Sequence, residues 1–204
     1  MQEYEIWEIA GHTLEYYDDT HIYLVDGVIV RSITQILKIR FGNKYNFVNS
    51  KTLERAAQKG RAVHTAIENL CVQGIESNLE EVKNFKFLRR LYKFEAIENE
   101  IPVILFDKGT PVAAGRVDMV VSMDGKLGGA DIKCVSSIDR EYLFYQLNLY
   151  RIAYKQCYGK VWDFCNGLHL NGDKRKVIPI PINEKMAWGI VDEYLKIKED
   201  LKNE

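Results

Sequence analysis

Two acidic residues near the middle of the chain have the type and setting that metal-dependent chemistry requires. Asp118 lies in the apolar stretch AAGRVDMVV and Asp131 in GGADIKCV. Between them, Asp124-Gly125 is a strong signal for a two-residue hairpin loop. Pairing steps outward symmetrically from such a loop, so we expect Asp118 and Asp131 to face each other with their Cβ atoms about 4.5–5.5 Å apart. Two like charges so placed destabilise a sheet, and a divalent cation between them is the simplest resolution.

Lys133 completes a group of residues that suits phosphodiester hydrolysis. In a strand its side chain shares the face of Asp131, while Ile132 points the other way into the core. Oxygen ligands suit Mg²⁺, which polarises a phosphate and activates a water, while a lysine orients that water or offsets charge in the transition state. A bulge at Gly128-Gly129 would instead slip the pairing and separate the two aspartates.

The short acid-x-lysine pattern is not specific by itself. Asp124-Gly-Lys126 and Glu81-Val-Lys83 also match it. Only Asp131-Ile-Lys133 lies in an apolar strand opposite a second acid that is itself within a strand. The structural alternative is an edge hairpin whose cross-strand charges are balanced by Arg116 and Lys133.

Three further polar residues occur at helical spacing. His64 shares a helix face with Gly60 and Glu68, one turn away on either side. A lone helical histidine is more often structural or on the surface than a ligand, but Gly60, which weakens a helix, favours close approach of another element here. Gln146 and Tyr150 project together from a second helix, either as part of an ordinary amphipathic face or toward DNA and the site.

Charge is distributed unevenly along the chain. The net charge of −1 over 204 residues gives no global electrostatic argument for nucleic-acid binding. Between residues 38 and 61, seven basic residues stand against the single Glu54, a local balance of +6. That run is either a solvated helix face or a phosphate-binding surface. Its basic residues are Lys38, Arg40, Lys44, Lys51, Arg55, Lys59 and Arg61.

Composition and cysteine usage are typical of a globular protein of the cytoplasm. The chain is 47% hydrophobic and 28% charged, and its N-terminus is acidic where a secretion signal would be basic. It contains no apolar run near the roughly 20 residues that cross a bilayer, so we expect no membrane partner. Cys-x-x-Cys pairs are absent, which argues against zinc, iron–sulfur and disulfide frameworks. We expect reduced, mostly buried thiols at Cys71, Cys134, Cys157 and Cys165.

The predicted elements place the candidate residues on a sheet between helices. Residues 21–30 alternate around Asp26-Gly27 as a hairpin, and Ser32 to Gln35 has the spacing of a capping box that opens a short helix. The hydrophobic period indicates one α/β or α+β domain. Helices are predicted from Asn49 or Ser50 to about Cys71 and over 79–97, 140–157 and 184–204, and strands over 101–106, 112–123, 127–135, 161–170 and 176–182.

Five motifs in order along the chain resemble those of the PD-(D/E)xK nuclease superfamily, and within it the RecB-like and phage-type exonuclease branch. They are GRAVH (Gly60–His64), Glu100 in NEIPV, GRVD (Gly115–Asp118), DIK (Asp131–Lys133) and QLNLY (Gln146–Tyr150). Each motif is short, so the specificity lies in their order and spacing. The N-terminal His-x-Tyr and Ser-x-Thr segments are also similar to phage-type members. The chain lacks the four-cysteine spacing of iron–sulfur relatives and shows no helicase motifs.

The resemblance implies a role for each matching residue. The implied ligands for Mg²⁺ or Mn²⁺ are His64, Asp118, Asp131 and the backbone carbonyl of Ile132. The implied catalytic residues are Lys133, Asp131, Asp118 and Glu100, although Glu98 lies close enough to compete with Glu100. The residues implied in DNA binding or site support are Gln146, Tyr150, Arg61 and Arg116.

The resemblance also implies a fold and a function. The fold would be a single α/β domain with a restriction-endonuclease-like core over residues 49–204, a central mixed β-sheet flanked by helices, after an N-terminal β-hairpin and helix extension over residues 1–48. The function would be metal-dependent hydrolysis of DNA phosphodiesters, with exonuclease action in recombination, repair or phage DNA processing favoured. The alternatives are a structure- or sequence-specific endonuclease and a non-catalytic DNA-binding or assembly protein. DNA is the implied partner, with a recombinase or single-strand-annealing protein as a further one, and an oligomer is left open.

Overall fold

The structure is a computed structural model that describes residues 4–42 and 50–201. Within these residues, nine strands and five helices form an α/β fold around a mixed sheet. The elements in chain order are β1 (Tyr4–Ile9), β2 (His12–Tyr17), β3 (Ile22–Val25), β4 (Val28–Ser32), α1 (Ile33–Phe41), α2 (Ser50–Gln73), α3 (Glu80–Tyr92), β5 (Glu95–Asp107), β6 (Thr110–Met123), β7 (Lys126–Lys133), α4 (Arg140–Tyr158), β8 (Phe164–Asn171), β9 (Lys174–Ile180) and α5 (Glu184–Asp200).

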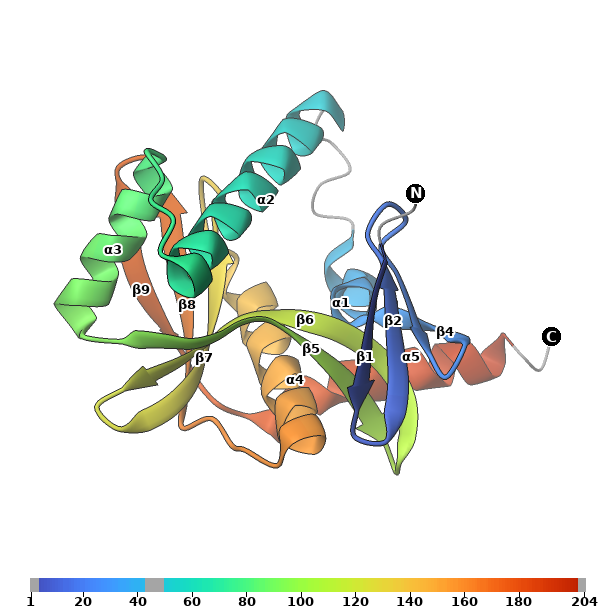
Figure 1. The fold of residues 1–204 in the computed structure, drawn as a ribbon. Coiled ribbons are helices and arrows are strands. Elements are labelled where there is room, and N and C mark those ends of the chain that lie inside the picture. Colours follow the sequence, from blue (N-terminus) through green and yellow to red (C-terminus); the bar gives the residue numbers. More distant parts are fainter. Residues whose placement is uncertain (1–3, 43–49, 202–204) are drawn as a thin grey trace.

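The sheet divides along one edge of its longest strand, β6. The strands follow the order β1-β2-β3-β4-β6-β7-β8-β9, and β5 pairs with the other edge of β6. On the shared edge, β4 pairs in parallel with β6 at Ala113 and Ala114, while β7 pairs antiparallel with it from Met119 to Met123. β4 and β7 therefore diverge on either side of residues 115–118 of β6. We call this place the fork; β6 crosses the middle of the molecule in Figure 1.

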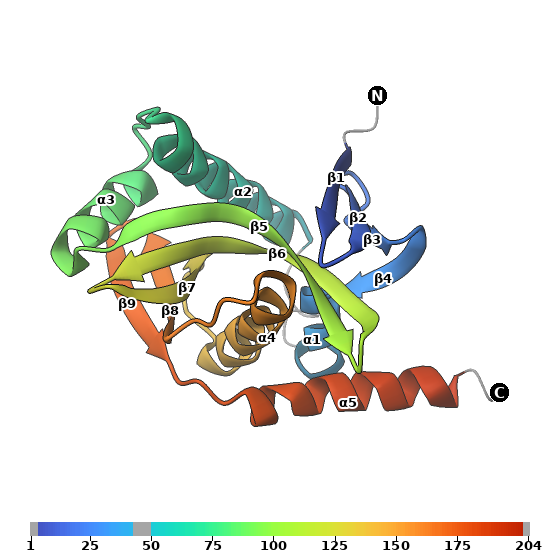
Figure 2. The same ribbon diagram turned by 60° about the horizontal axis from the view of Figure 1, so that its bottom comes forward.

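Helices cover both faces of the sheet. α2 and α3 pack over one face, where Val63 and Phe85 join a core with Met119 and Ile132 of the sheet. α1, α4 and α5 pack against the other face, with α4 directly beneath β5, β6 and β7 (Figures 1 and 2). The candidate residues on β6 and β7 are thus held between two helical layers.

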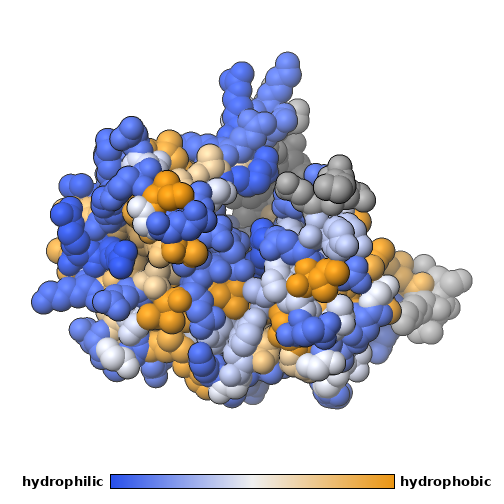
Figure 3. All heavy atoms as spheres, viewed as in Figure 1, coloured by the Kyte–Doolittle hydropathy of each residue, from blue (hydrophilic) through white to orange (hydrophobic). Residues whose placement is uncertain are grey.

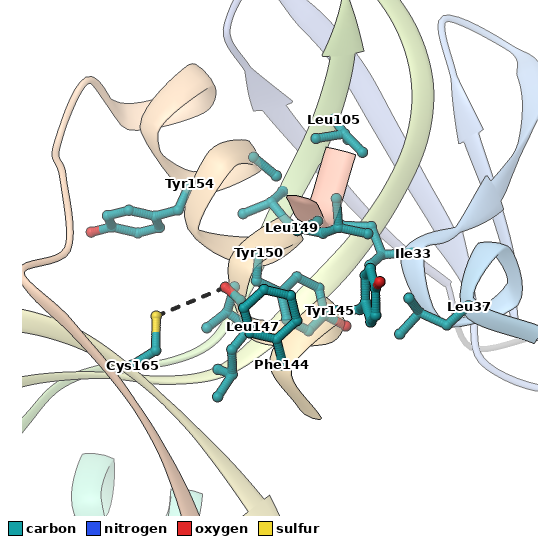
Figure 4. Close-up of a cluster of buried hydrophobic side chains, with 14 of the residues drawn as sticks. Ile33, Leu37, Leu105, Phe144, Tyr145, Leu147, Leu149, Tyr150, Tyr154 and Cys165 are labelled. Carbon is teal, nitrogen blue, oxygen red and sulfur yellow. Dashed lines mark hydrogen bonds between the residues drawn. The ribbon is translucent and has the colours of Figure 1, made fainter. Parts of the chain in front are cut away.

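α4 is the most deeply buried helix of this arrangement. Figure 4 shows Leu147, Leu149 and Tyr150 of α4 packed among side chains of the sheet and of α1. The thiol of Cys165 on β8 lies 4.0 Å from the backbone oxygen of Leu147, which ties the helix to the strand beneath it. Residues 143–150 of α4 are buried without a break, so this part of the helix supports the strands that carry the acids.

The hairpin register predicted from Asp124-Gly125 is confirmed. Both residues have positive φ, 51° and 74°, as a type I′ turn requires, and the pairing steps outward without interruption to Met119 opposite Ala130. No bulge forms at Gly128 and Gly129. A Cβ on either glycine would meet the ring of Phe164 or Trp162 at 2.2 or 2.1 Å, so these glycines make room for aromatic rings.

The N-terminal turn signals are also confirmed. Val25 pairs with Val28 around Asp26-Gly27, and Ser32 caps α1 with the reciprocal Gln35 hydrogen bonds of a capping box. β1 and β2, which the sequence did not predict, extend this hairpin into a four-stranded meander with β3 and β4.

The predicted C-terminal end of the helix over residues 79–97 was wrong. α3 stops at Tyr92 because Lys93 adopts a left-handed conformation with φ of 53°, and β5 begins at Glu95. α2 covers the predicted helix and continues to Gln73; its proposed cap at Asn49 lies outside the described residues.

Two expectations from composition can be compared with the described residues. None of their helices is long and apolar enough to cross a membrane. All four cysteines are free, but only Cys165 is fully buried; the other three are partly exposed, which is less burial than the sequence analysis expected.

Candidate metal centre

Three side chains from three elements converge at the fork. Asp118 lies in β6, and Glu100 lies opposite it in β5, between the pairs that Asn99 and Ile101 make with β6. α2 brings His64 over both, so that Nδ1 of the imidazole is 3.6 Å from Oε1 of Glu100 and 3.7 Å from Oδ2 of Asp118. One donor atom from each residue lies within 4.8 Å of the other two. These three residues define the candidate metal centre.

Glu100, rather than Glu98, is the acid that β5 contributes. The carboxylate of Glu98 accepts a hydrogen bond of 3.0 Å from Tyr154 and lies 3.7 Å from the ammonium of Lys160, away from His64. Glu100 has a φ of 48°, a left-handed conformation that a residue with a Cβ rarely adopts within a strand. Such local strain is concentrated at functional sites.

The backbone of Ile132 orients two members of the centre. Its N–H donates to Oδ2 of Asp118 at 2.7 Å, and its carbonyl oxygen lies 3.1 Å from Nε2 of His64. If that carbonyl accepts the Nε2 proton, the lone pair of Nδ1 faces Glu100 and Asp118. The Ile132 carbonyl, implied by the motif resemblance as a metal ligand, here contacts the far side of the imidazole instead.

Asp131 and Lys133 form a buried ion pair beside the centre. Asp131 is 2% exposed, and Nζ of Lys133 lies 2.6 Å from its Oδ2. Burial raises the pKa of the Asp131 carboxyl to about 6, although the Lys133 ammonium opposes the rise. Burial opposes the charge on Lys133 too, but the carboxylates of Asp131 and Asp118 outweigh it and raise the pKa of that ammonium. Each charge therefore depends on the other.

The residues predicted as ligands are not all in one cluster. The sequence predicted Asp131 as a ligand together with His64 and Asp118. In the structure, the donor atoms of His64, Glu100 and Asp118 lie within 4.8 Å of one another, while the Asp131 carboxylate pairs with Lys133.

The β6–β7 ladder ends at Met119 opposite Ala130, one position before Asp118 and Asp131, so the expected pair of aspartates is not part of it. Glu100 was expected at the site only from the motif resemblance. Its position opposite Asp118 depends on a register shift in the β5–β6 pairing between Leu105 and Phe106, which the sequence did not predict.

The side chains at the fork fit a divalent cation. Separations of 3.6 and 3.7 Å are within the roughly 4.2 Å that two ligands of one ion can span at metal–ligand distances near 2.1 Å. The two carboxylates suit Mg²⁺ or Mn²⁺, and such a site tolerates an imidazole beside them. Oδ2 of buried Asp131 is paired with the Lys133 ammonium, whereas its Oδ1 accepts no hydrogen bond from the described residues. A buried acceptor without a hydrogen bond is costly.

The acids also set the charge of His64. Burial disfavours the imidazolium, yet the carboxylates of Asp118 and Glu100 outweigh that effect and raise the pKa of His64 to about 9. Without a metal, the imidazole is therefore protonated at neutral pH and balances part of the negative charge. A metal ion that takes Nδ1 must displace this proton.

Gln146 and Tyr150 lie against the sheet beneath the acids. Both are 5% exposed, which leaves little surface for DNA and favours the supporting role. Gly115 allows this packing, since a Cβ there would lie 2.9 Å from the Tyr150 ring. The Oε1 of Gln146 is buried without a hydrogen bond from the described residues.

The basic residues before His64 divide into engaged and available groups. Arg40 bonds to Tyr145 and Glu193, and Lys59 lies 2.7 Å from Glu81, so both connect elements of the fold. Arg55 and Arg61 are exposed on α2, with no ion-pair partner among the described residues. Lys44 lies outside those residues.

The projecting end of α2 is hydrophilic. This end extends beyond the rest of the molecule in Figure 1, and Figure 3 shows hydrophilic side chains over it. Gly60 does not provide the close approach that the sequence analysis expected, because nothing lies within 4 Å of the position of its Cβ.

Comparisons with known proteins add little about the site. No family model matches the chain, and no curated protein matches it. Among solved structures, the crystal structure of SSO0001 is similar with a TM-score of 0.48 and 13% sequence identity, over 82% of this chain and 76% of that chain. A likeness at that level carries no argument about function.

Proposed function

We propose that this protein is a metal-dependent nuclease that hydrolyses DNA phosphodiester bonds on a restriction-endonuclease-like core. The observation that carries the proposal is the convergence of His64, Glu100 and Asp118 at the fork, next to the buried pair of Asp131 and Lys133. The five sequence motifs that resemble the PD-(D/E)xK superfamily fall on the elements that build this site.

The proposed chemistry assigns a task to each group. His64, Glu100 and Asp118 would hold Mg²⁺ or Mn²⁺, which supplies charge to polarise the phosphate and to activate water. Lys133 holds its proton at Nζ, and an ammonium in that position stabilises negative charge that develops on the phosphate. Asp131 keeps Lys133 charged and oriented and adds negative charge beside the metal ligands.

The choice of DNA as substrate rests on charge and on the motif resemblance. Arg55 and Arg61 are exposed on the helix that also carries His64, and cationic side chains that contact phosphates bind nucleic acid without regard to sequence. The resemblance favours exonuclease action in recombination, repair or phage DNA processing. An endonuclease would use the same metal centre and differ in how it admits DNA.

Degradation of end-labelled linear DNA, beside a closed circle, tests this function. We expect wild-type protein to degrade the linear DNA with Mg²⁺ or Mn²⁺ and to leave it intact with EDTA. Asp118→Asn removes a charged ligand and should abolish the reaction, whereas Asp124→Asn in the hairpin turn should not. Cutting of the circle would support the endonuclease alternative. No metal-dependent cleavage of either DNA would contradict the proposal and favour a non-catalytic DNA-binding protein.

A further inference from the structure

Arg116 connects the candidate metal centre to the N-terminal meander. Its Nη1 donates to Oε1 of Glu5 at 2.7 Å, and its Nε lies 3.5 Å from Oε2 of Glu100. The guanidinium carbon also sits 4.7 Å from the centroid of the Tyr16 ring. One side chain of β6 therefore contacts β1, β2 and β5 at once.

The two oxygens of Glu100 have different neighbours. Oε1 faces His64, while Oε2 faces Arg116. The backbone of Glu100 is in the left-handed region, so the strand geometry alone does not give its side chain an ordinary orientation. The ion pair with Arg116 at Oε2 therefore acts on the same carboxylate whose Oε1 faces His64.

The contacts of Arg116 use the planar shape of a guanidinium. Nε and Nη1 lie beside different carboxylates, while the guanidinium carbon sits over the Tyr16 ring. A lysine ammonium is a single point charge that cannot reproduce this arrangement. Arg116 is also only partly exposed, with 24% of its side chain accessible.

We propose that Arg116 is a positioning residue that orients Glu100 toward a divalent cation, and that Glu5 and Tyr16 hold Arg116 for this task. The N-terminal meander then completes the metal centre without supplying a ligand. This inference rests on the metal centre of the proposed function. Partners outside the coordination shell commonly change metal affinity by about 10- to 100-fold when they are removed.

A role in positioning predicts the opposite result from a role in charge alone. If Arg116 only neutralised Glu100, Arg116→Gln would strengthen cation binding because a competing positive charge would be gone, and Arg116→Lys would change little. If Arg116 positions Glu100, both variants should bind the cation more weakly. Glu5→Gln should weaken binding in the same direction by a smaller factor, because Tyr16 would still hold the guanidinium.

Isothermal titration calorimetry of the full chain with Mn²⁺, without DNA, distinguishes these roles. We expect Arg116→Lys and Arg116→Gln to weaken Mn²⁺ binding about tenfold. The matched controls are Arg90→Lys and Arg90→Gln, at an exposed arginine of α3, and these should bind as wild type does. Near-UV circular dichroism should show that each variant is folded.

The outcomes separate this inference from the proposed function. If wild type binds Mn²⁺ and the Arg116 and Glu5 variants bind it equally well or more tightly, the positioning role is overturned while the metal centre stands. If wild type binds no Mn²⁺, the metal centre fails and the inference fails with it. If the Arg116 variants do not fold, Glu5→Gln decides alone: weaker Mn²⁺ binding supports the role, and unchanged binding overturns it.

Discussion

Glu98 and Glu100 are two residues apart on one strand, yet their carboxylates have different partners. Glu98 contacts Tyr154 and Lys160, whereas Glu100 faces His64 and Arg116. The motif resemblance favours Glu100 in NEIPV, but it does not exclude Glu98, because both glutamates precede the same apolar run. The choice follows from which of them pairs across from Asp118.

Glutamine substitutions at these two positions form a matched test. Glu100→Gln removes a charged ligand and should weaken Mn²⁺ binding by at least about tenfold, since even residues outside the coordination shell have effects of that size. Glu98→Gln should bind Mn²⁺ as wild type does, because its carboxylate faces away from the centre. Isothermal titration measures both affinities. Equal losses in the two variants would show that the effect is a general loss of charge.

The raised pKa of His64 predicts how stability depends on pH without metal. The pKa is about 9 in the folded protein against about 6.5 in an unfolded chain, so the stabilising interaction of the imidazolium with Asp118 and Glu100 is fully present below pH 6.5. It is lost as pH rises through 9. Urea unfolding in EDTA between pH 6.5 and 9.5 should show a steeper loss of stability for wild type than for His64→Gln. If stability fell equally with pH in both proteins, the imidazolium of His64 would not be the source of this pH dependence.

At the scale of elements, turn signals and packing glycines were informative in different ways. The Asp124-Gly125 signal was sufficient to predict the β6–β7 register, because a type I′ turn fixes its own pairing. Gly60 was interpreted as a point of close approach, but the position of its Cβ is open, whereas Gly129, interpreted as a possible bulge, is a close contact. The deciding partner, Trp162, is distant in sequence.

Alanine at these two glycines should have opposite effects on stability. Gly129→Ala would place a Cβ 2.1 Å from the fully buried Trp162 ring, and such overpacking costs about 1–3 kcal/mol. Gly60→Ala has open space and lies inside α2, so it should stabilise the protein by roughly 0.5–1 kcal/mol. Chemical denaturation gives both changes in the free energy of unfolding. A stable Gly129→Ala variant would show that the sheet and Trp162 can move apart.

The exposed arginines of α2 should bind DNA through its phosphates. Arg55→Gln and Arg61→Gln should each weaken DNA binding and lower the slope of log K against log salt by about 1. Lys59→Gln should mainly lower stability, because Lys59 pairs with the buried carboxylate of Glu81. Fluorescence anisotropy over a salt series, with EDTA to prevent cleavage, measures the slopes. A larger slope change for Lys59→Gln than for Arg61→Gln would contradict this division of roles.

At the scale of the whole molecule, the N-terminal meander and the remaining strands form one sheet. The sequence motifs predicted the order of elements around the site, but they did not predict that β4 would join β6 in parallel or that β1 and β2 would exist. These features depend on pairing between residues that are far apart in the sequence. The fork, and the contact of Arg116 with Glu5, are consequences of that pairing.

The central claim is that the fork holds a divalent cation between α2, β5 and β6. An anomalous difference map from crystals grown with Mn²⁺ tests it most directly. We predict a single strong peak bounded by Nδ1 of His64 and the carboxylates of Glu100 and Asp118. No peak at the fork under saturating Mn²⁺, or a peak elsewhere in the molecule, would contradict the account.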